Sequence, residues 1–205
     1  MKYLSCLAVL ITINLCEAKA QSFNELTETH RTKYKNSFLA DPKAPLKAAD
    51  MEHLHFFDPD SAYNVIATVT LLQNEKPFQM PTFDGTSKEF IRYAEISFTL
   101  RDTLVKMTLY KSPTITANPV YRDHLFLPFT DRTNGKETYG GGRYVDLSSK
   151  DIINGSLILD LNKAYNPYCA YSDGYRCPVP PEENDLPLHI RAGERTYTGS
   201  KKQRN

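Results

Sequence analysis

The segment Gly140 to Tyr144 reads Gly-Gly-Gly-Arg-Tyr and combines two features that suit an anionic ligand. Consecutive glycines can present backbone N–H groups in a concave nest, and the Arg143 guanidinium offers a planar fork for a carboxylate or phosphate. A glycine run is also typical of a bulge where a strand bends, and a buried Arg143 could pair with Asp131 or Glu194 as a structural tie. No Gly-Lys-Ser/Thr and no helical pattern follow the glycines, which excludes a nucleotide-binding P-loop.

An irregular stretch from Ala164 to Pro187 follows, with five prolines and four tyrosines. Flat rings with hydroxyl groups suit sugars or aromatic ligands, although such a loop also needs tyrosines simply to pack. We predict a site for a small-molecule or saccharide-like ligand between the two segments, with Asn166 fixing its orientation. The predicted ligand-binding residues are Arg143, Tyr144, Tyr165, Asn166, Tyr168 and Tyr171.

Two carboxylates and two cysteines are further candidates for chemistry. Glu183 or Glu194 could act as acid or base beside Arg143 in a hydrolase, but no spacing of paired acids supports this role. Cys169 and Cys177 are an even pair close in sequence, which predicts a disulfide in an oxidising compartment. Closing that loop would stabilise the fold by about 2.5 kcal/mol.

His53 and His55 would face the same way in a strand, and Asp58 and Asp60 follow them. Without a third ligand nearby in sequence, such a pattern is more typical of surface residues than of a metal centre. We therefore predict neither a metal nor a cofactor.

The elements that must position these residues are mostly strands. Residues 65–72 form a β-branched run of period two, and 91–100 and 104–110 predict a hairpin around Arg101-Asp102-Thr103. Turn signals such as Asn134-Gly135 and Asn154-Gly155 separate the later strands. These later strands are predicted at 124–129, 142–147, 156–161 and 186–192.

A helix is predicted over residues 22–38, because Ser22 can cap it and Glu25 completes a capping box. Many short strands without βαβ spacing indicate a mainly β fold. We expect an antiparallel barrel or sandwich with an N-terminal helix and a long irregular Pro/Tyr-rich loop.

The first twenty residues have the layout of a secretory signal peptide: Lys2, an apolar stretch over 4–15, and Ala18-Lys19-Ala20 before the cut. The mature chain should begin at Gln21 and be exported, as a periplasmic or secreted protein. An alternative is a lipid anchor on Cys16, although Leu15 stands where a lipoprotein signal prefers a small residue.

Cleavage removes two lysines and one glutamate from 25 basic and 24 acidic residues, which leaves 23 of each. This balance argues against a nucleic-acid partner, since such binding relies on excess Lys and Arg. The remaining length suits one β-rich domain over 21–198, followed by a disordered tail over 199–205. We expect no integral membrane segment after cleavage, because the apolar stretch of the leader is too short for a membrane anchor.

Several longer motifs form a pattern over nearly the whole mature chain, from about Tyr34 to Tyr197. They are Met80-Pro81-Thr82, Leu109-Tyr110, Leu125 to Asp131, Thr133 to Tyr144, Ala164 to Pro167, Cys169 to Tyr171, Cys177-Pro178, Pro180-Pro181, Glu183-Asn184, Leu186-Pro187 and Ile190 to Glu194. On these motifs the chain resembles a bacterial and archaeal family known only as domain of unknown function 1684. The resemblance implies a compact, often exported domain without an agreed biochemical activity. The chain departs from the family around His53-Leu54-His55, where the family is aromatic or polar.

Three functions fit these observations. The first is a small-ligand binding module outside the cytoplasm. The second is a hydrolase acting on an envelope or nutrient substrate, and the third is a structural or interaction protein of the cell envelope. An aromatic-lined cleft favours the first, a pocket exposing Arg143 with a carboxylate favours the second, and a filled interior favours the third.

Overall fold

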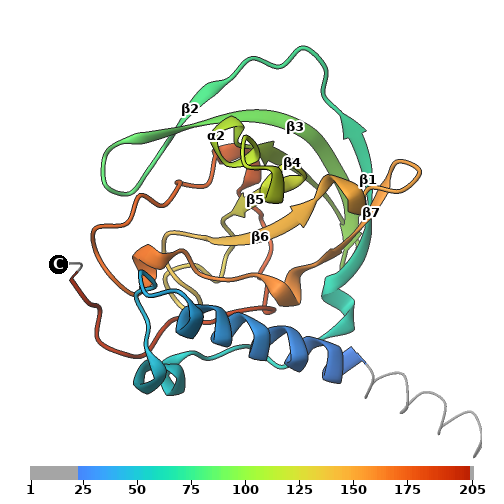
Figure 1. Ribbon diagram of the computed structural model, residues 1–205. Helices are drawn as coiled ribbons and strands as arrows, with labels where there is room; N and C mark the ends of the chain where they lie inside the picture. The colour runs from blue at the N-terminus through green and yellow to red at the C-terminus, as the bar shows by residue number, and fades with distance from the viewer. Residues whose placement is uncertain (1–22, 204–205) are drawn as a thin grey trace, which may run out of the picture.

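The computed structural model describes residues 23–203, so the predicted signal peptide, the cleavage site before Gln21 and Cys16 lie outside the described residues. An antiparallel sheet curls into a half-barrel, and the N-terminal helix lies across one end of it (Figure 1). The predicted mainly β fold with an N-terminal helix is thereby confirmed. None of the helices within the described range is long and apolar enough to cross a membrane.

Seven strands form the sheet in the order β6-β5-β4-β3-β1-β7, and β2 pairs with β3 beside this path. All predicted strands up to residue 161 are present, β5 with the predicted ends and the others with shifted ends, whereas β2 was not predicted. The strands are β1 (Asn64–Leu71), β2 (Phe78–Pro81), β3 (Ser87–Leu100), β4 (Thr103–Lys111), β5 (His124–Phe129), β6 (Arg143–Ser148) and β7 (Ser156–Asp160).

Helical segments are short apart from the N-terminal helix, whose described residues are 23–40. That helix runs two residues past its predicted end and stops at Asp41-Pro42, because proline disfavours helical geometry in the residue before it. The other helical segments are η1 (Ala48–His53), η2 (Ser61–Tyr63), α2 (Pro113–Thr116), η3 (Pro119–Tyr121), η4 (Ser149–Asp151), η5 (Leu161–Lys163), η6 (Tyr168–Ala170) and η7 (Glu182–Asn184).

The β3–β4 hairpin turns where the sequence predicts it. Leu100 pairs with Thr103, and the two residues between them, Arg101 and Asp102, have φ of 47° and 63°. Two left-handed residues match the right-handed twist of the flanking strands, which accounts for this tight connection.

The prediction of a strand over residues 186–192 is wrong. This segment runs inside the half-barrel, where Leu186, Ile190 and Ala192 are buried in the main core. The apolar side chains of this segment pack into the core, but its backbone forms no β-ladder. Instead, the carbonyls of Ile190 and Ala192 accept hydrogen bonds from the Arg143 guanidinium. The period-two pattern of residues 186–192 therefore predicts correctly which residues are buried, but it does not show that the segment pairs with a strand.

Two strands at the end of the sheet are buried on both faces. Leu125 and Leu127 of β5 and Val145 of β6 point into the main core. Phe126 and Tyr144, which alternate with them, join a second apolar cluster on the outer face. Because helical and loop segments cover this outer face, the fold creates a second interior outside the half-barrel.

Residues 199–203 differ from the disordered tail that we predicted. The Lys202 N–H donates to the Tyr171 carbonyl at 2.8 Å, and the Asp173 N–H donates to the Lys202 carbonyl at 2.9 Å. The Lys201 Nζ lies 2.6 Å from a carboxylate oxygen of Asp173, and the Lys202 ammonium pairs with Asp50. Backbone pairing and two ion pairs therefore fasten this end of the chain to the Tyr-rich loop and η1.

Candidate functional site

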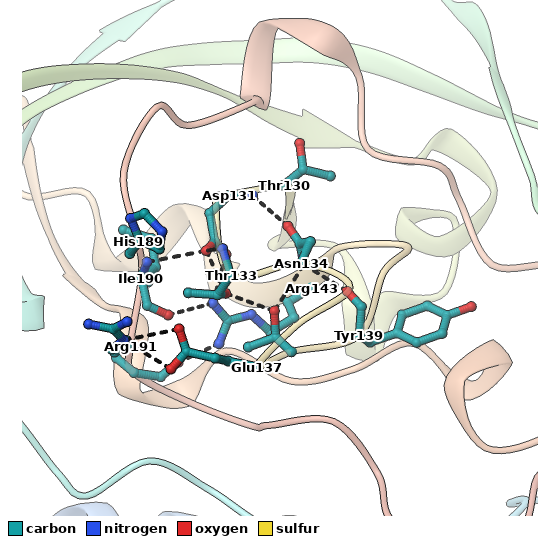
Figure 2. A network of polar contacts seen from close by, with 12 residues as sticks. Thr130, Asp131, Thr133, Asn134, Glu137, Tyr139, Arg143, His189, Ile190 and Arg191 are labelled. Carbon is teal, nitrogen blue, oxygen red and sulfur yellow. Dashed lines mark hydrogen bonds and ion pairs between the residues drawn. The ribbon is translucent and has the colours of Figure 1, made fainter.

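Arg143, the first residue of β6, points into the half-barrel and is fully buried. Its Nη2 donates to Asp131 Oδ2 and to the Ile190 carbonyl, both at 2.8 Å, and its Nη1 donates to the Ala192 carbonyl. Figure 2 shows the guanidinium enclosed by these groups, which we call the Arg143 network. The structure thus places Arg143 as the structural tie to Asp131 and not beside an accessible ligand.

The partner carboxylate is itself fully hydrogen-bonded. Asp131 Oδ1 accepts from the Thr133 backbone N–H at 2.8 Å, from the Thr133 hydroxyl at 2.6 Å and from the Ile190 N–H at 3.2 Å. Burial lowers the pKa of Arg143, and the charge of Asp131 opposes this shift. A buried ion pair persists only where its remaining donors and acceptors are satisfied, and this network largely meets that condition.

The glycines before Arg143 serve close packing. Gly142 has φ of +86°, and a Cβ on it would lie 2.6 Å from the Phe129 carbonyl oxygen. A Cβ on Gly141 would lie 2.5 Å from the Tyr139 ring. Gly142 therefore requires glycine, because its φ is positive and the close atom belongs to the backbone, whereas a side chain at Gly141 would push aside the Tyr139 and Phe83 rings. This close packing is the structural interpretation that the sequence left open.

Glu194 lies at the centre of a second buried cluster, the Glu194 network. Its carboxylate accepts from the Tyr34 hydroxyl at 2.9 Å, from the Tyr171 hydroxyl at 2.6 Å, and from the Asn166 backbone and side-chain N–H groups at 2.9 and 2.8 Å. Burial raises the pKa of Glu194 to about 7, although all of these hydrogen bonds act in the opposite direction. Asn166 and Tyr171 thus tie the Tyr-rich loop to the C-terminal segment, and Tyr34 ties the N-terminal helix to the same carboxylate. Neither Asn166 nor Tyr171 lines the outer pocket described below.

The other candidate acid, Glu183, also pairs elsewhere. Its Oε1 accepts from the Tyr110 hydroxyl at 2.8 Å and from the Arg92 Nε at 2.9 Å. Partial burial acts to raise the pKa of Glu183, but these hydrogen bonds outweigh it and hold the pKa below its ordinary value. Neither acid lies beside a solvent-accessible Arg143, so the predicted acid–arginine arrangement is absent from residues 23–203.

A pocket of about 840 Å³ lies over the outer face of the sheet, and we call it the outer pocket. Its floor consists of alternating residues from three strands, because every second side chain of a strand projects to the same face. These floor residues are Lys88 and Phe90 of β3, His124 and Phe126 of β5, and Tyr144 and Asp146 of β6.

The walls of the outer pocket are mainly aromatic. Tyr165 and Tyr168 come from the Tyr-rich loop, Tyr34 and Phe38 from the N-terminal helix, and Tyr121 from η3. Reciprocal backbone hydrogen bonds of 2.9 Å join Tyr165 to Tyr144 and hold the loop against β6. The structure therefore brings together three of the six predicted ligand residues, Tyr144, Tyr165 and Tyr168.

Polar groups converge at Asp146. Its Oδ1 lies 2.9 Å from His124 Nε2, and its Oδ2 accepts from the Tyr165 hydroxyl at 2.8 Å. Burial and the Asp146 charge raise the pKa of Tyr165 well above its ordinary value, so this hydroxyl stays a donor. The Nδ1 of His124 is buried and has no hydrogen-bond partner among the described residues.

Basic side chains occupy two parts of the pocket lining. Lys88 and Arg176 lie together, since Arg176 Nη2 donates to the carbonyl of Ser87 at 3.0 Å. Lys163 lies near His30, whose pKa is lowered by burial and then by the Lys163 charge. Lys88, Arg176, His124 and Asp146 were not singled out from the sequence.

The predicted disulfide is not formed in the structure, where Cys169 and Cys177 are free, buried thiols. The two residues are nevertheless close, since the Cys169 N–H donates to Cys177 Sγ at 3.2 Å. A hydrogen bond from Cys177 lowers the pKa of Cys169 to about 7. Cys177 also lines the outer pocket, so the pair adjoins the candidate site.

The two histidines near η1 face the C-terminal segment. His55 Nε2 lies 3.0 Å from the Thr198 hydroxyl, and His53 Nδ1 lies 3.5 Å from the same oxygen. No group of three or more potential metal ligands occurs within residues 23–203.

Comparisons with known proteins place this fold in a family. No curated protein matches the chain. The chain is similar to the solution NMR structure of an uncharacterised protein from Haloarcula marismortui (gene locus rrnAC0354), with 32% identity and a TM-score of 0.62 over 86% of this chain and 100% of that one. Residues 49–195 match the family model described as "Protein of unknown function (DUF1684)". The chain therefore belongs to the DUF1684 family.

Proposed function

We propose that the protein is a small-ligand binding module whose site is the outer pocket. The observation that carries this proposal is a hollow of about 840 Å³ over an apolar floor, with a few polar groups converging on it. Ligand sites of small molecules have this size and composition. The hollow lies outside the filled main core, so the packing of that core does not account for it.

The lining favours a ligand with a flat, largely apolar body. Phe126 lies edge-on to Tyr144 with ring centroids 4.7 Å apart and stacks with Phe90 at 5.5 Å, so the floor is a continuous aromatic surface. An aromatic ring or the apolar face of a sugar packs well on such a surface.

A neutral hydrophobic dye tests this proposal. We expect N-phenyl-1-naphthylamine to fluoresce on binding the wild-type protein. Ser37→Trp should weaken this signal, because Ser37 lines the pocket and an indole there would occupy part of the space that the dye needs. Asn36→Trp is the matched control: Asn36 is the adjacent, exposed helix residue outside the pocket lining. Equal dye binding by wild type and Ser37→Trp would contradict the proposal.

Hydrolysis is the second candidate function, and the His124–Asp146 pair favours it. Asp146 holds one ring nitrogen of His124, and a histidine oriented by a carboxylate can act as a base. Because Nδ1 is buried, the ring must turn toward the pocket before this nitrogen can take a proton from water. Glu183 and Glu194 no longer carry this hypothesis, because neither lines the pocket. If the protein is a hydrolase, it should turn over members of a panel of nitrophenyl esters and glycosides, and His124→Gln should remove that activity. No turnover of the panel by wild type would count against this candidate.

We also propose that the protein is exported and that its two cysteines become joined. In an oxidising compartment the Cys169 thiolate, favoured by its lowered pKa, would attack a small-molecule or protein disulfide. Attack by Cys177 on the mixed disulfide then forms the bond and releases two thiols from the oxidant. We expect N-terminal sequencing of the exported protein to begin at Gln21, and non-reducing peptide mapping to show one Cys169–Cys177 link. An intact Met1 on cytosolic protein contradicts export, while a lipid on Cys16 supports the anchored alternative.

A further inference from the structure

We infer that the ligand of the outer pocket carries an acidic group, which is bound between Lys88 and Arg176. This inference rests on the proposed function and adds the chemical class of the ligand.

Lys88 projects from the pocket floor without an acidic partner. It precedes Phe90 by two residues on β3, so both side chains share the outer face. Lys88 is half-buried, and no carboxylate within residues 23–203 forms an ion pair with it. A partly desolvated ammonium without a counter-charge favours an anion strongly, since loss of hydration raises the strength of any ion pair it can form.

Arg176 is held in place beside Lys88. Its Nε donates to the Thr86 hydroxyl at 2.9 Å and its Nη2 to the Ser87 carbonyl at 3.0 Å, which ties the Tyr-rich loop to the start of β3. Asp84 is its acidic partner, with a carboxylate oxygen 3.8 Å from Nε. This arrangement fixes one edge of the guanidinium and leaves Nη1 to donate to a ligand, as suits a carboxylate, sulfonate or phosphate.

The charged side chains that line the pocket include more cations than carboxylates. Lys88, Lys163 and Arg176 face a single carboxylate, Asp146, whose two oxygens are engaged by His124 and Tyr165. Lys163 has its own acid, Asp160, at 3.7 Å. Arg176 likewise has Asp84 at 3.8 Å. The uncompensated positive charge is therefore that of Lys88, at the end of the aromatic floor where Arg176 also lies. The best fit is an amphipathic anion whose body rests on Phe90 and Phe126.

Two dyes of nearly the same shape test the acidic group separately from the pocket. 8-Anilinonaphthalene-1-sulfonate is the anionic relative of N-phenyl-1-naphthylamine, so the pair differs mainly by the sulfonate. We expect wild type to bind the sulfonate about tenfold more tightly than the neutral dye at low salt, with the preference reduced at high salt. Measurement near pH 8 keeps His30 uncharged, since its pKa is lowered from 6.5.

Lys88→Gln should weaken binding of the sulfonate about tenfold and leave the neutral dye within about twofold. Lys76→Gln is the matched control, because it removes the same charge from an exposed loop position outside the pocket lining. Thermal melts verify that both variants fold. If the sulfonate binds Lys88→Gln and wild type equally, or if both dyes weaken in parallel, the inference is overturned. Binding of neither dye to wild type contradicts the pocket itself, whereas neutral-dye binding without a sulfonate preference contradicts only the acidic group.

Discussion

The Arg143 network and the outer pocket lie on opposite faces of the same strand and use polar groups in opposite ways. Arg143 is wholly buried, and Asp131 and backbone carbonyls satisfy its two terminal nitrogens. Tyr144, the next residue, opens onto a pocket where Lys88 has no acidic partner within the described chain. Satisfied groups hold a fold together, whereas unsatisfied ones beside a hollow are available to a ligand.

The same division occurs in the Tyr-rich loop. Tyr165 contributes to the pocket wall, while its neighbour Asn166 donates to the buried Glu194. Tyr171 also belongs to the Glu194 network. Residues that are adjacent in sequence thus serve binding on one side and stability on the other, and the following predictions test that division.

Removal of Arg143 should have the largest effect on stability. Arg143→Ala leaves Asp131 buried without its counter-charge, so we expect the free energy of unfolding to fall by about 3–5 kcal/mol. The control is Arg132→Ala, which breaks an exposed pair with Asp185 at 3.5 Å and should cost less than about 1 kcal/mol. Urea denaturation measures both. If Arg143→Ala is as stable as Arg132→Ala, the Arg143 network is not structural.

Glu194 should make stability depend on pH in the unusual direction for an acid. Its pKa rises from an ordinary 4.5 to about 7 in the fold, so the folded state holds the proton more tightly than the unfolded chain. The resulting stabilisation is complete below about pH 4.5 and is lost as the pH rises to about 7, a change of at most about 3 kcal/mol.

Denaturation at several pH values, compared between wild type and Glu194→Gln, isolates this contribution from those of other acids. The difference between the two free energies of unfolding should decrease from acid to neutral pH. A difference that stays constant would show that Glu194 has an ordinary pKa in the fold.

Two tyrosines of one loop give the most direct matched pair. Tyr171→Phe removes a donor from a buried carboxylate and should cost about 1.5–3 kcal/mol, with dye binding unchanged. Tyr165→Phe removes a hydrogen bond to the exposed Asp146 and should cost only about 0.5–1.5 kcal/mol while altering dye affinity. Titrations and melts of both variants compare the two effects. If Tyr171→Phe changed dye affinity and Tyr165→Phe caused the larger loss of stability, the assignment of Tyr165 to binding and Tyr171 to stability would be wrong.

Much of the sheet was predictable because its signals are local. The period-two run of β1 and the turn after Leu100 depend on neighbours in sequence, and β5 has the predicted bounds His124–Phe129. The same alternation could have placed His124 with Phe126 and Tyr144 with Asp146 on one face. The alternation could not predict which face of these strands the helix and the loops would cover.

The errors came from long-range contacts. Residues 186–192 have strand-like periodicity, but their partner is the guanidinium of Arg143, about fifty residues earlier in the chain. Tyr34 meets Glu194 across 160 residues, a contact that no spacing in a single sequence reveals. Arg143 and the glycines were correctly recognised as important, and only the fold decides between binding and packing for such residues.

A crystal structure with 8-anilinonaphthalene-1-sulfonate bound tests the central claim most directly. The account predicts the naphthalene ring against Phe90 and Phe126 and the sulfonate within ion-pair distance of Lys88. Arg143 should remain bonded to Asp131, as it is in the free protein. A dye bound to the Arg143 guanidinium, with Asp131 displaced, or a dye bound outside the outer pocket would contradict the division between the two faces.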